Sequence, residues 1–182
     1  MATPDYSHFL SLMKQGAFAE AVSFAERQCV AAGDRNEFWL TQVSLALTRA
    51  GRHAEAVQSA DRALAIAPAN RYALLARADA LYAKADYDPA LKAYEEALDH
   101  ERTLPRARRG VLQCLLHLSQ WQRILDLICA WGMEPAAANA VRVKALAGLG
   151  RIEEAQETCR AWLRSSPDNP QALWELTKIG RA

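Results

Sequence analysis

Apolar residues recur along the chain at intervals of three and four positions. Phe38, Leu40, Val43 and Leu47 follow this spacing, and a second such run covers residues 56–64 after a glycine. This spacing places apolar side chains on one face of a helix. No apolar run approaches the roughly 18 residues that a membrane span needs. The pattern therefore predicts pairs of short amphipathic helices and no membrane-spanning segment.

A short sequence motif occurs five times along the chain. It consists of a small residue at a turn, a bulky residue, two mostly polar residues and a final small residue, as in Gly51-Arg52-His53-Ala54-Glu55-Ala56. The spacings between the final residues of successive copies are 35, 34, 34 and 31. Because two helical runs fit within each period, every copy predicts one helical hairpin. The final residues are Ala21, Ala56, Ala90, Ile124 and Ala155.

The residue types at the predicted helix ends have physical reasons. Gly51 and Gly150 are expected to end first helices, because glycine tolerates the left-handed conformation found just after a helix. Pro68 is expected to stop a second helix, since proline lacks an amide donor. Asp86 is predicted to cap the helix that follows it, and the pair Asp168-Asn169 to supply the cap of the last helix.

Alanine makes up about one residue in five of the chain. Several of these alanines recur at fixed points of the repeat, where two paired helices have to approach closely. A bulky residue at such a point is expected to force the helices apart. The positions are Ala56, Ala63, Ala90, Ala97 and Ala155.

This repeat resembles the tetratricopeptide repeat (TPR) family, whose helix–turn–helix unit of about 34 residues has a similar signature of glycine, aromatic residues and Ala-Leu. The best match covers residues 71–102. The resemblance implies an all-α fold, a right-handed α-solenoid of about five hairpins with a C-terminal capping helix. A single domain over residues 1–182 is expected, with hairpins at 3–33, 36–68, 70–102, 104–132 and 135–167 and the capping helix at 170–180.

The fourth copy departs from the pattern. Ile124 stands where the small alanine belongs, and the spacing to the next copy falls to 31 residues. The second helix of this hairpin is therefore predicted to be short.

The resemblance also implies where a partner binds. The first helices of TPR hairpins line a concave surface that holds a peptide or helix of another protein. The alternative for two of its aromatic residues, Phe38 and Tyr72, is packing against neighbouring hairpins. The mixture of apolar and basic positions predicts a segment with an apolar anchor and acidic neighbours. The candidate residues are Phe38, Gln42, Leu45, Arg49, Tyr72, Leu75, Asp79, Tyr82, Arg106, Arg109, Gln113 and Lys144.

Some TPR proteins clamp the C-terminal carboxylate of a chaperone with a set of Lys and Asn residues. The equivalent face here carries Thr41, Leu45, Tyr72 and Ala76, and no register reproduces that set. A clamp of this type is not predicted.

The net charge of the chain and one local cluster of arginines bear on the class of partner. The formal net charge is +1, which does not favour nucleic acid as a partner. A local cluster contains Arg102, Arg106, Arg108 and Arg109. It has two interpretations: a contact for an acidic peptide, or a solvated face paired with nearby carboxylates, Asp99 and Glu101.

Few residues form a pattern that indicates catalysis or metal binding. Four cysteines lie far apart, without a C-x-x-C pair, and are predicted to be reduced, buried thiols rather than metal ligands or disulfides. The histidines are isolated, and no hydrolase, nucleotide-binding or zinc-protease motif occurs. The sequence predicts a protein that is not an enzyme and needs no cofactor.

Three functions remain open. The first is an adaptor or scaffold that binds another protein in the concave groove. The alternatives are a bacterial-type secretion or assembly chaperone for an aggregation-prone subunit, and a non-catalytic regulatory subunit. Self-association through the N-terminal hairpin is also open, because solenoid ends expose apolar faces. Neither a secretory leader nor a lipidation motif is visible, so a cytoplasmic location is expected.

Overall fold

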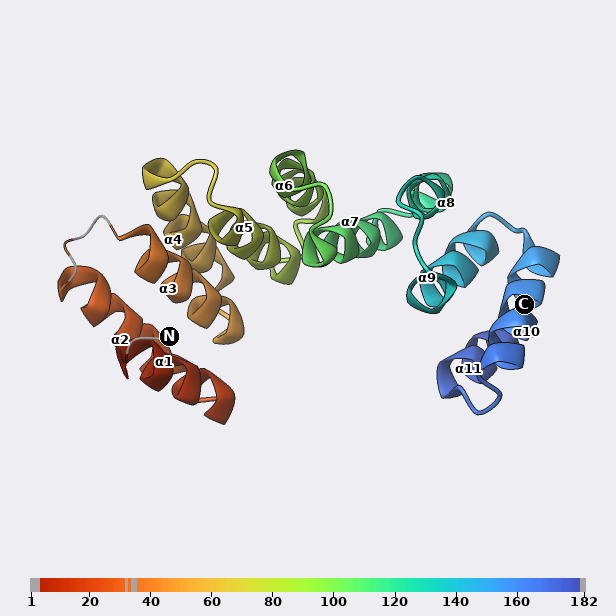
Figure 1. The fold of residues 1–182 in the computed structure, drawn as a ribbon, viewed down its shortest axis with the longest axis horizontal. Helices are drawn as coiled ribbons and strands as arrows, with labels where there is room; N and C mark the ends of the chain where they lie inside the picture. Colours follow the sequence, from red (N-terminus) through yellow and green to blue (C-terminus); the bar gives the residue numbers. More distant parts are fainter. Residues whose placement is uncertain (1–3, 32, 34–35, 181–182) are drawn as a thin grey trace. The chain divides into compact units, whose positions relative to one another are not determined.

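The computed structural model describes residues 4–31, 33 and 36–180, and in this part of the chain helices are the only regular secondary structure (Figure 1). The all-α helical-repeat fold predicted from the sequence is confirmed. The helices are α1 (Pro4–Gln15), α2 (Phe18–Ala31), α3 (Glu37–Arg49), α4 (His53–Ile66), α5 (Arg71–Ala83), α6 (Tyr87–His100), α7 (Pro105–His117), α8 (Trp121–Ala130), α9 (Pro135–Gly148), α10 (Ile152–Ser165) and α11 (Pro170–Ile179).

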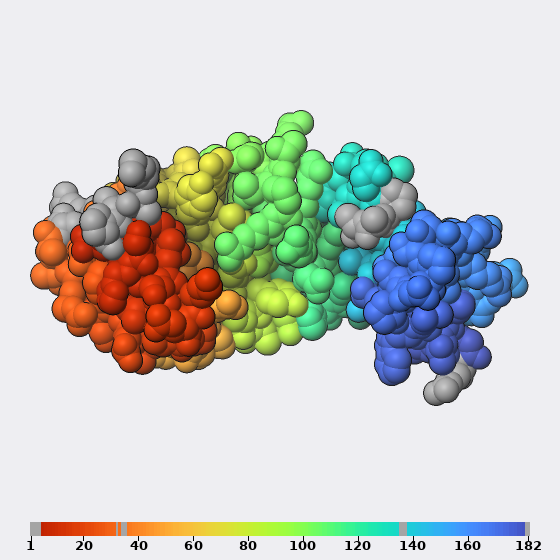
Figure 2. Space-filling view, turned by 60° about the horizontal axis from the view of Figure 1, so that its bottom comes forward, coloured from red at the N-terminus to blue at the C-terminus, as the bar shows by residue number. Residues whose placement is uncertain are grey.

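The chain divides into two compact units, Met1–Val111 and Leu112–Ala182, with the boundary inside α7. In the N-terminal unit α3 packs against α2, α4 and α5, and α5 also packs against α6. In the C-terminal unit α9 packs against α8, α10 and α11 (cyan to blue in Figure 2). The single domain and the right-handed superhelix stay predictions, and each unit is described by itself.

The hairpin turns share one backbone conformation. After α3, Gly51 has φ +80°, and the amide of Arg52 donates to the carbonyl of Leu47 at 2.9 Å. These bonds satisfy carbonyl groups left open at a helix end. Two turns reach the left-handed region without glycine, at Ala85 (φ +66°) and Ser119 (φ +56°). Turn geometry is thus set by the helix packing as well as by glycine.

Small residues sit between the paired helices as predicted. Each of the alanines named for close approach is fully buried. Ile124, which replaces alanine in the fourth hairpin, is also fully buried. The short second helix predicted there is confirmed, because α8 has 10 residues whereas α4, α6 and α10 each have 14.

Two local predictions are wrong. Asp86 precedes α6 but makes no capping hydrogen bond, and its carboxylate pairs with Lys84 Nζ at 2.6 Å. Cys129 is exposed, whereas the other three cysteines are buried. Glu101, one of the two carboxylates named beside the arginine cluster, pairs with Arg71 of α5. By contrast, Asn169 caps α11 as predicted.

None of the helices in the described part of the chain is long and apolar enough to cross a bilayer.

Candidate partner-binding site

A pocket of about 510 Å³ lies in the N-terminal unit, on the first helices of its hairpins. Its walls come from α1, α3, α5 and the first turn of α7, and we call it the N-terminal pocket. It is lined by Tyr6, Glu37, Phe38, Thr41, Gln42, Leu45, Asn70, Tyr72, Leu75 and Arg106.

Six of the twelve predicted groove residues therefore surround one pocket. They are spaced along the sequence by roughly one repeat, so equivalent turns of α3, α5 and α7 bring them together. The six are Phe38, Gln42, Leu45, Tyr72, Leu75 and Arg106.

The aromatic residues of the pocket are only partly covered. The ring of Phe38 meets Tyr6 edge-on at a centroid distance of 5.2 Å and lies at the same distance from Trp39. Phe38 nevertheless stays 41% exposed, and Tyr72 stays 60% exposed. Packing against neighbours thus accounts for only part of the Phe38 surface, and both rings remain accessible.

Tyr72 is held in place by its neighbour Arg71. The Arg71 guanidinium lies 4.9 Å from the centre of the Tyr72 ring, and its Nη2 donates to the Tyr72 hydroxyl at 2.9 Å. Its Nη1 pairs with Glu101 at 2.7 Å. The hydrogen bonds to Tyr72 and to Glu101 raise the pKa of Arg71. This arrangement restrains the Tyr72 ring before any partner arrives.

Arg106 supplies the positive charge of the pocket. Its guanidinium pairs with Asp79, which also accepts a hydrogen bond from the Tyr94 hydroxyl. Side-chain exposure is 57% for Arg106 and 20% for Asp79. The carboxylate is therefore mostly covered and orients the arginine, while part of the guanidinium faces solvent.

The other predicted groove residues of the N-terminal unit do not line this pocket. Arg49 lies over the Phe18 ring at 5.9 Å, and Tyr82 meets Tyr87 edge-on at 5.5 Å. Arg109 is exposed on α7 and stands outside the pocket lining.

Gln113 and Lys144 line a different pocket, of about 500 Å³, within the C-terminal unit. Lys144 Nζ lies 3.8 Å from Oε1 of Glu175, whose side chain is 7% exposed. Eight of the twelve predicted groove residues thus line two pockets, six in the N-terminal unit and two in the C-terminal unit. The second pocket is also lined by Leu116, His117, Trp121, Ala147, Gly148, Ile152, Glu175, Lys178 and Ile179.

Four residues of the N-terminal pocket lie outside the predicted set, namely Tyr6, Glu37, Thr41 and Asn70. A signal for Tyr6 exists in the sequence, since it precedes Thr41 by 35 residues, the spacing of the first two repeats. Asn70 owes its place to its role as the cap of α5, where its side chain accepts from Tyr72 N and Ala73 N.

Within residues 4–31, 33 and 36–180, no group of three or more His, Cys, Asp or Glu side chains is arranged to hold a metal ion.

Comparisons with known proteins agree with this geometry. A family model described as "Tetratricopeptide repeat" matches residues 6–71 and 75–123. No curated protein sequence matches the chain.

Several solved structures share the fold. A tetratricopeptide repeat protein from Parabacteroides merdae is 16% identical, with a TM-score of 0.70 over 94% of this chain and 68% of that one. The second TPR domain of human RPAP3, in complex with the HSP70 peptide SGPTIEEVD, is 17% identical, with a TM-score of 0.55 over 60% of this chain and 91% of that one. The first TPR of Spaghetti (RPAP3), bound to the HSP90 peptide SRMEEVD, is 23% identical, with a TM-score of 0.57 over 62% of this chain and 89% of that one.

The repeat register, the stacked hairpins and the family model, which covers more than half of the chain, point to the same conclusion: the protein belongs to the tetratricopeptide repeat family.

Proposed function

We propose that this chain is a non-enzymatic protein-interaction module that binds a segment of another protein in the N-terminal pocket. The observation that carries the proposal is the pocket itself, where accessible aromatic rings and one arginine surround about 510 Å³. Aromatic residues and arginine are the side chains that most often dominate binding energy in protein interfaces. A mostly apolar pocket with a few oriented polar groups is also the usual form of a binding site.

The lining specifies the chemistry of the partner segment. Phe38, Leu45 and Leu75 offer an apolar surface for one bulky side chain. Arg106, oriented by Asp79, offers exposed donors for a carboxylate. The proposed partner segment therefore carries an apolar anchor next to an Asp or Glu residue.

The solved TPR domains with bound HSP70 and HSP90 peptides support peptide binding as a use of this fold. The side chains here differ from a Lys and Asn clamp, since Thr41, Leu45 and Tyr72 occupy that face. The proposed partner is therefore a different segment from those chaperone C-termini.

An affinity purification from native lysate tests the proposal. Wild-type protein is compared with Tyr72→Ala and Arg106→Ala, while Arg62→Ala on α4 serves as a control outside the pocket. Partners that bind in the pocket are lost from both pocket variants and kept by the control, with circular dichroism checking the fold. Retention of every partner by both pocket variants would contradict the proposal.

A second experiment, expression of a captured partner without this chain, distinguishes an adaptor from a chaperone. A captured partner that stays soluble when expressed alone indicates an adaptor. A partner that aggregates without this chain indicates a chaperone.

A further inference from the structure

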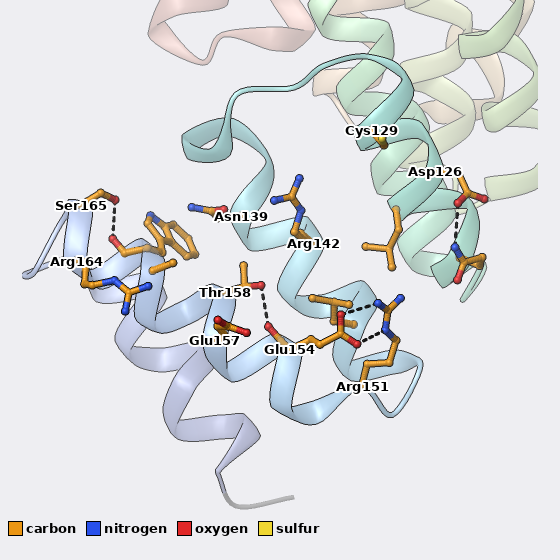
Figure 3. A pocket seen from close by; sticks show the side chains of 15 residues that line it. Asp126, Cys129, Asn139, Arg142, Arg151, Glu154, Glu157, Thr158, Arg164 and Ser165 are labelled. Carbon is orange, nitrogen blue, oxygen red and sulfur yellow. Dashed lines mark hydrogen bonds and ion pairs between the residues drawn. The ribbon is translucent and has the colours of Figure 1, made fainter.

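The C-terminal unit carries a pocket of about 680 Å³ between α8 and α10, above α9 (Figure 3). We call it the α8–α10 pocket. Asn139, Arg142 and Leu146 of α9 line it, whereas Lys144 and Gly148 of the same helix line the other pocket of this unit. The two pockets therefore use opposite faces of α9.

The degenerate fourth repeat explains why this space is open. With 10 residues, α8 is four residues shorter than α10, a difference of one turn and about 6 Å of helix. The chain leaves α8 through Gly132, which has φ +56°. The pocket lining includes Cys129 in the last turn of α8 and Asn139, Arg142 and Leu146 of α9.

Two polar side chains form the floor of the pocket. Asn139 is only 6% exposed, and Arg142 is half-buried. In the part of the chain that the structure describes, neither side chain makes a hydrogen bond or an ion pair. Because neither side chain is engaged within the chain, the donors of both remain available to a group that enters the pocket. Figure 3 shows both side chains rising from α9 into the space between the flanking helices.

The third repeat shows which residues stand at the positions equivalent to Asn139 and Arg142. Ala90 and Ala155 are equivalent in the repeat, so Leu74 and Arg77 correspond to Asn139 and Arg142. Leu74 is fully buried and apolar. The guanidinium of Arg77 is neutralised from both sides, by Asp61 of α4 at 2.7 Å and Glu96 of α6 at 3.7 Å.

The two positions around Arg142 that correspond to Asp61 and Glu96 carry no carboxylate. In the same register Cys129 of α8 stands in place of Asp61, and Ala161 of α10 stands in place of Glu96. Both residues line the α8–α10 pocket. Arg142 thus keeps the charge of Arg77 but has lost both of its internal counterions.

The pocket wall carries further charged residues, namely Asp126, Arg151, Glu154, Glu157 and Arg164, and some of them are paired with each other or with neighbours. Arg151 and Glu154 pair with each other at 2.6 Å, and Asp126 accepts a hydrogen bond from Gln122 at 2.9 Å. The nearly buried Trp162, together with Leu125 and Leu146, contributes apolar atoms to the lining. The floor therefore offers donors to an acidic group flanked by apolar contacts.

We propose that the α8–α10 pocket binds an aspartate or glutamate side chain of a partner protein, carried on a short segment that fills the space of the missing turn. The carboxylate takes the place of Asp61 and Glu96 beside Arg142, with the Asn139 amide as a second donor. A side chain is favoured over a chain terminus because both lost counterions are side-chain carboxylates. This site is separate from the N-terminal pocket, and its test is independent of the function proposed there.

The test uses the full chain and three N-acetylated peptides. The first is ALELA with an amidated C-terminus, the second is amidated ALQLA, and the third is ALQLA with a free C-terminal carboxylate. We expect amidated ALELA to shift the NMR signals of the Asn139 amide and the Arg142 Nε–H group, and amidated ALQLA to leave them unchanged. Arg142→Gln should weaken ALELA binding about tenfold or more, as expected for loss of a charged hydrogen bond. Arg160→Gln, on α10 outside the pocket, should bind as the wild type does.

A second variant restores the arrangement of the third repeat. Cys129→Asp combined with Ala161→Glu supplies internal carboxylates, so it should abolish ALELA binding while the circular dichroism spectrum stays unchanged. Three results would overturn the proposal: equal shifts with ALELA and amidated ALQLA, binding of the free-terminus peptide alone, or undiminished binding by the double variant.

Discussion

The hydroxyl group of Tyr94 donates a 2.5 Å hydrogen bond to Oδ1 of Asp79, and the second oxygen of the same carboxylate pairs with Arg106. Tyr94 lies on α6, Asp79 on α5 and Arg106 on α7, so the carboxylate links three successive helices. Because Arg106 lines the N-terminal pocket, this link connects the packing of the repeats to the candidate site.

Removing the hydroxyl should weaken the fold measurably. We expect Tyr94→Phe to lower the free energy of unfolding by about 1.5–3 kcal/mol, because a hydrogen bond to a charged group is lost. Urea unfolding of Tyr94→Phe, Asp79→Asn and the double variant gives the coupling energy between the two residues. A coupling energy of zero would show that the bond contributes nothing.

Glycine at position 110 leaves room for the Tyr94 ring. A Cβ atom there would lie 2.4 Å from Cζ of Tyr94, which is shorter than any real contact. Gly110→Ala should therefore cost about 1–3 kcal/mol through overpacking, despite the better helix propensity of alanine. Thermal unfolding measures the loss, and adding Tyr94→Leu should recover part of it. A Gly110→Ala variant as stable as the wild type would contradict this packing.

The hairpin turns give a pair of opposite predictions. Gly51 (φ +80°) has no atom near the place of a Cβ, so Gly51→Ala should cost about 1 kcal/mol from backbone strain alone. Ala85 already bears this strain at φ +66°, and Ala85→Gly should leave stability equal or raise it by up to about 1 kcal/mol. Denaturant midpoints of both variants check the signs, and a clear loss for Ala85→Gly would contradict the argument.

Chaperone C-terminal peptides should not bind. The N-terminal pocket has Thr41, Leu45 and Tyr72 on the face where a clamp needs Lys and Asn. Titration with SRMEEVD, followed by calorimetry, should give no saturable binding at concentrations that saturate a clamp-type TPR domain, which serves as the positive control. The prediction would be wrong if the wild type bound SRMEEVD saturably. If Arg106→Ala then abolished that binding, Arg106 alone would do the work of the Lys and Asn residues of a clamp.

One of the four cysteines should react quickly with thiol reagents. Cys129 is exposed, whereas Cys29, Cys114 and Cys159 are buried. Burial raises the pKa of Cys159, and because the thiolate is the nucleophile, its reaction is slowed further. Labelling of the native protein at neutral pH should modify Cys129 first, as mass spectrometry of the digested protein can show. Equal labelling of Cys159 on the same timescale would contradict the burial.

Much of the fold follows from local chemistry and repetition. Gly51 and Gly150 mark turns, and Ala56 and Ala90 mark places of close approach, because their residue types suit one conformation or one spacing. The same register identified Phe38 and several other pocket residues. Asp86 shows where prediction from residue type fails. An aspartate before a helix is typical of a cap, but here its carboxylate pairs with Lys84 instead.

The sequence by itself therefore determined the helical hairpins, the length of each repeat and part of the lining of the N-terminal pocket. These depend on backbone preferences and on apolar spacing within about one repeat. Only the tertiary structure decided the partners of the charged side chains. Asp79 meets Arg106, and Arg77 meets Asp61, because neighbouring helices bring them within reach. The open space above Asn139 and Arg142 likewise arises where the short α8 ends, since a cavity depends on what the adjacent helices fail to cover.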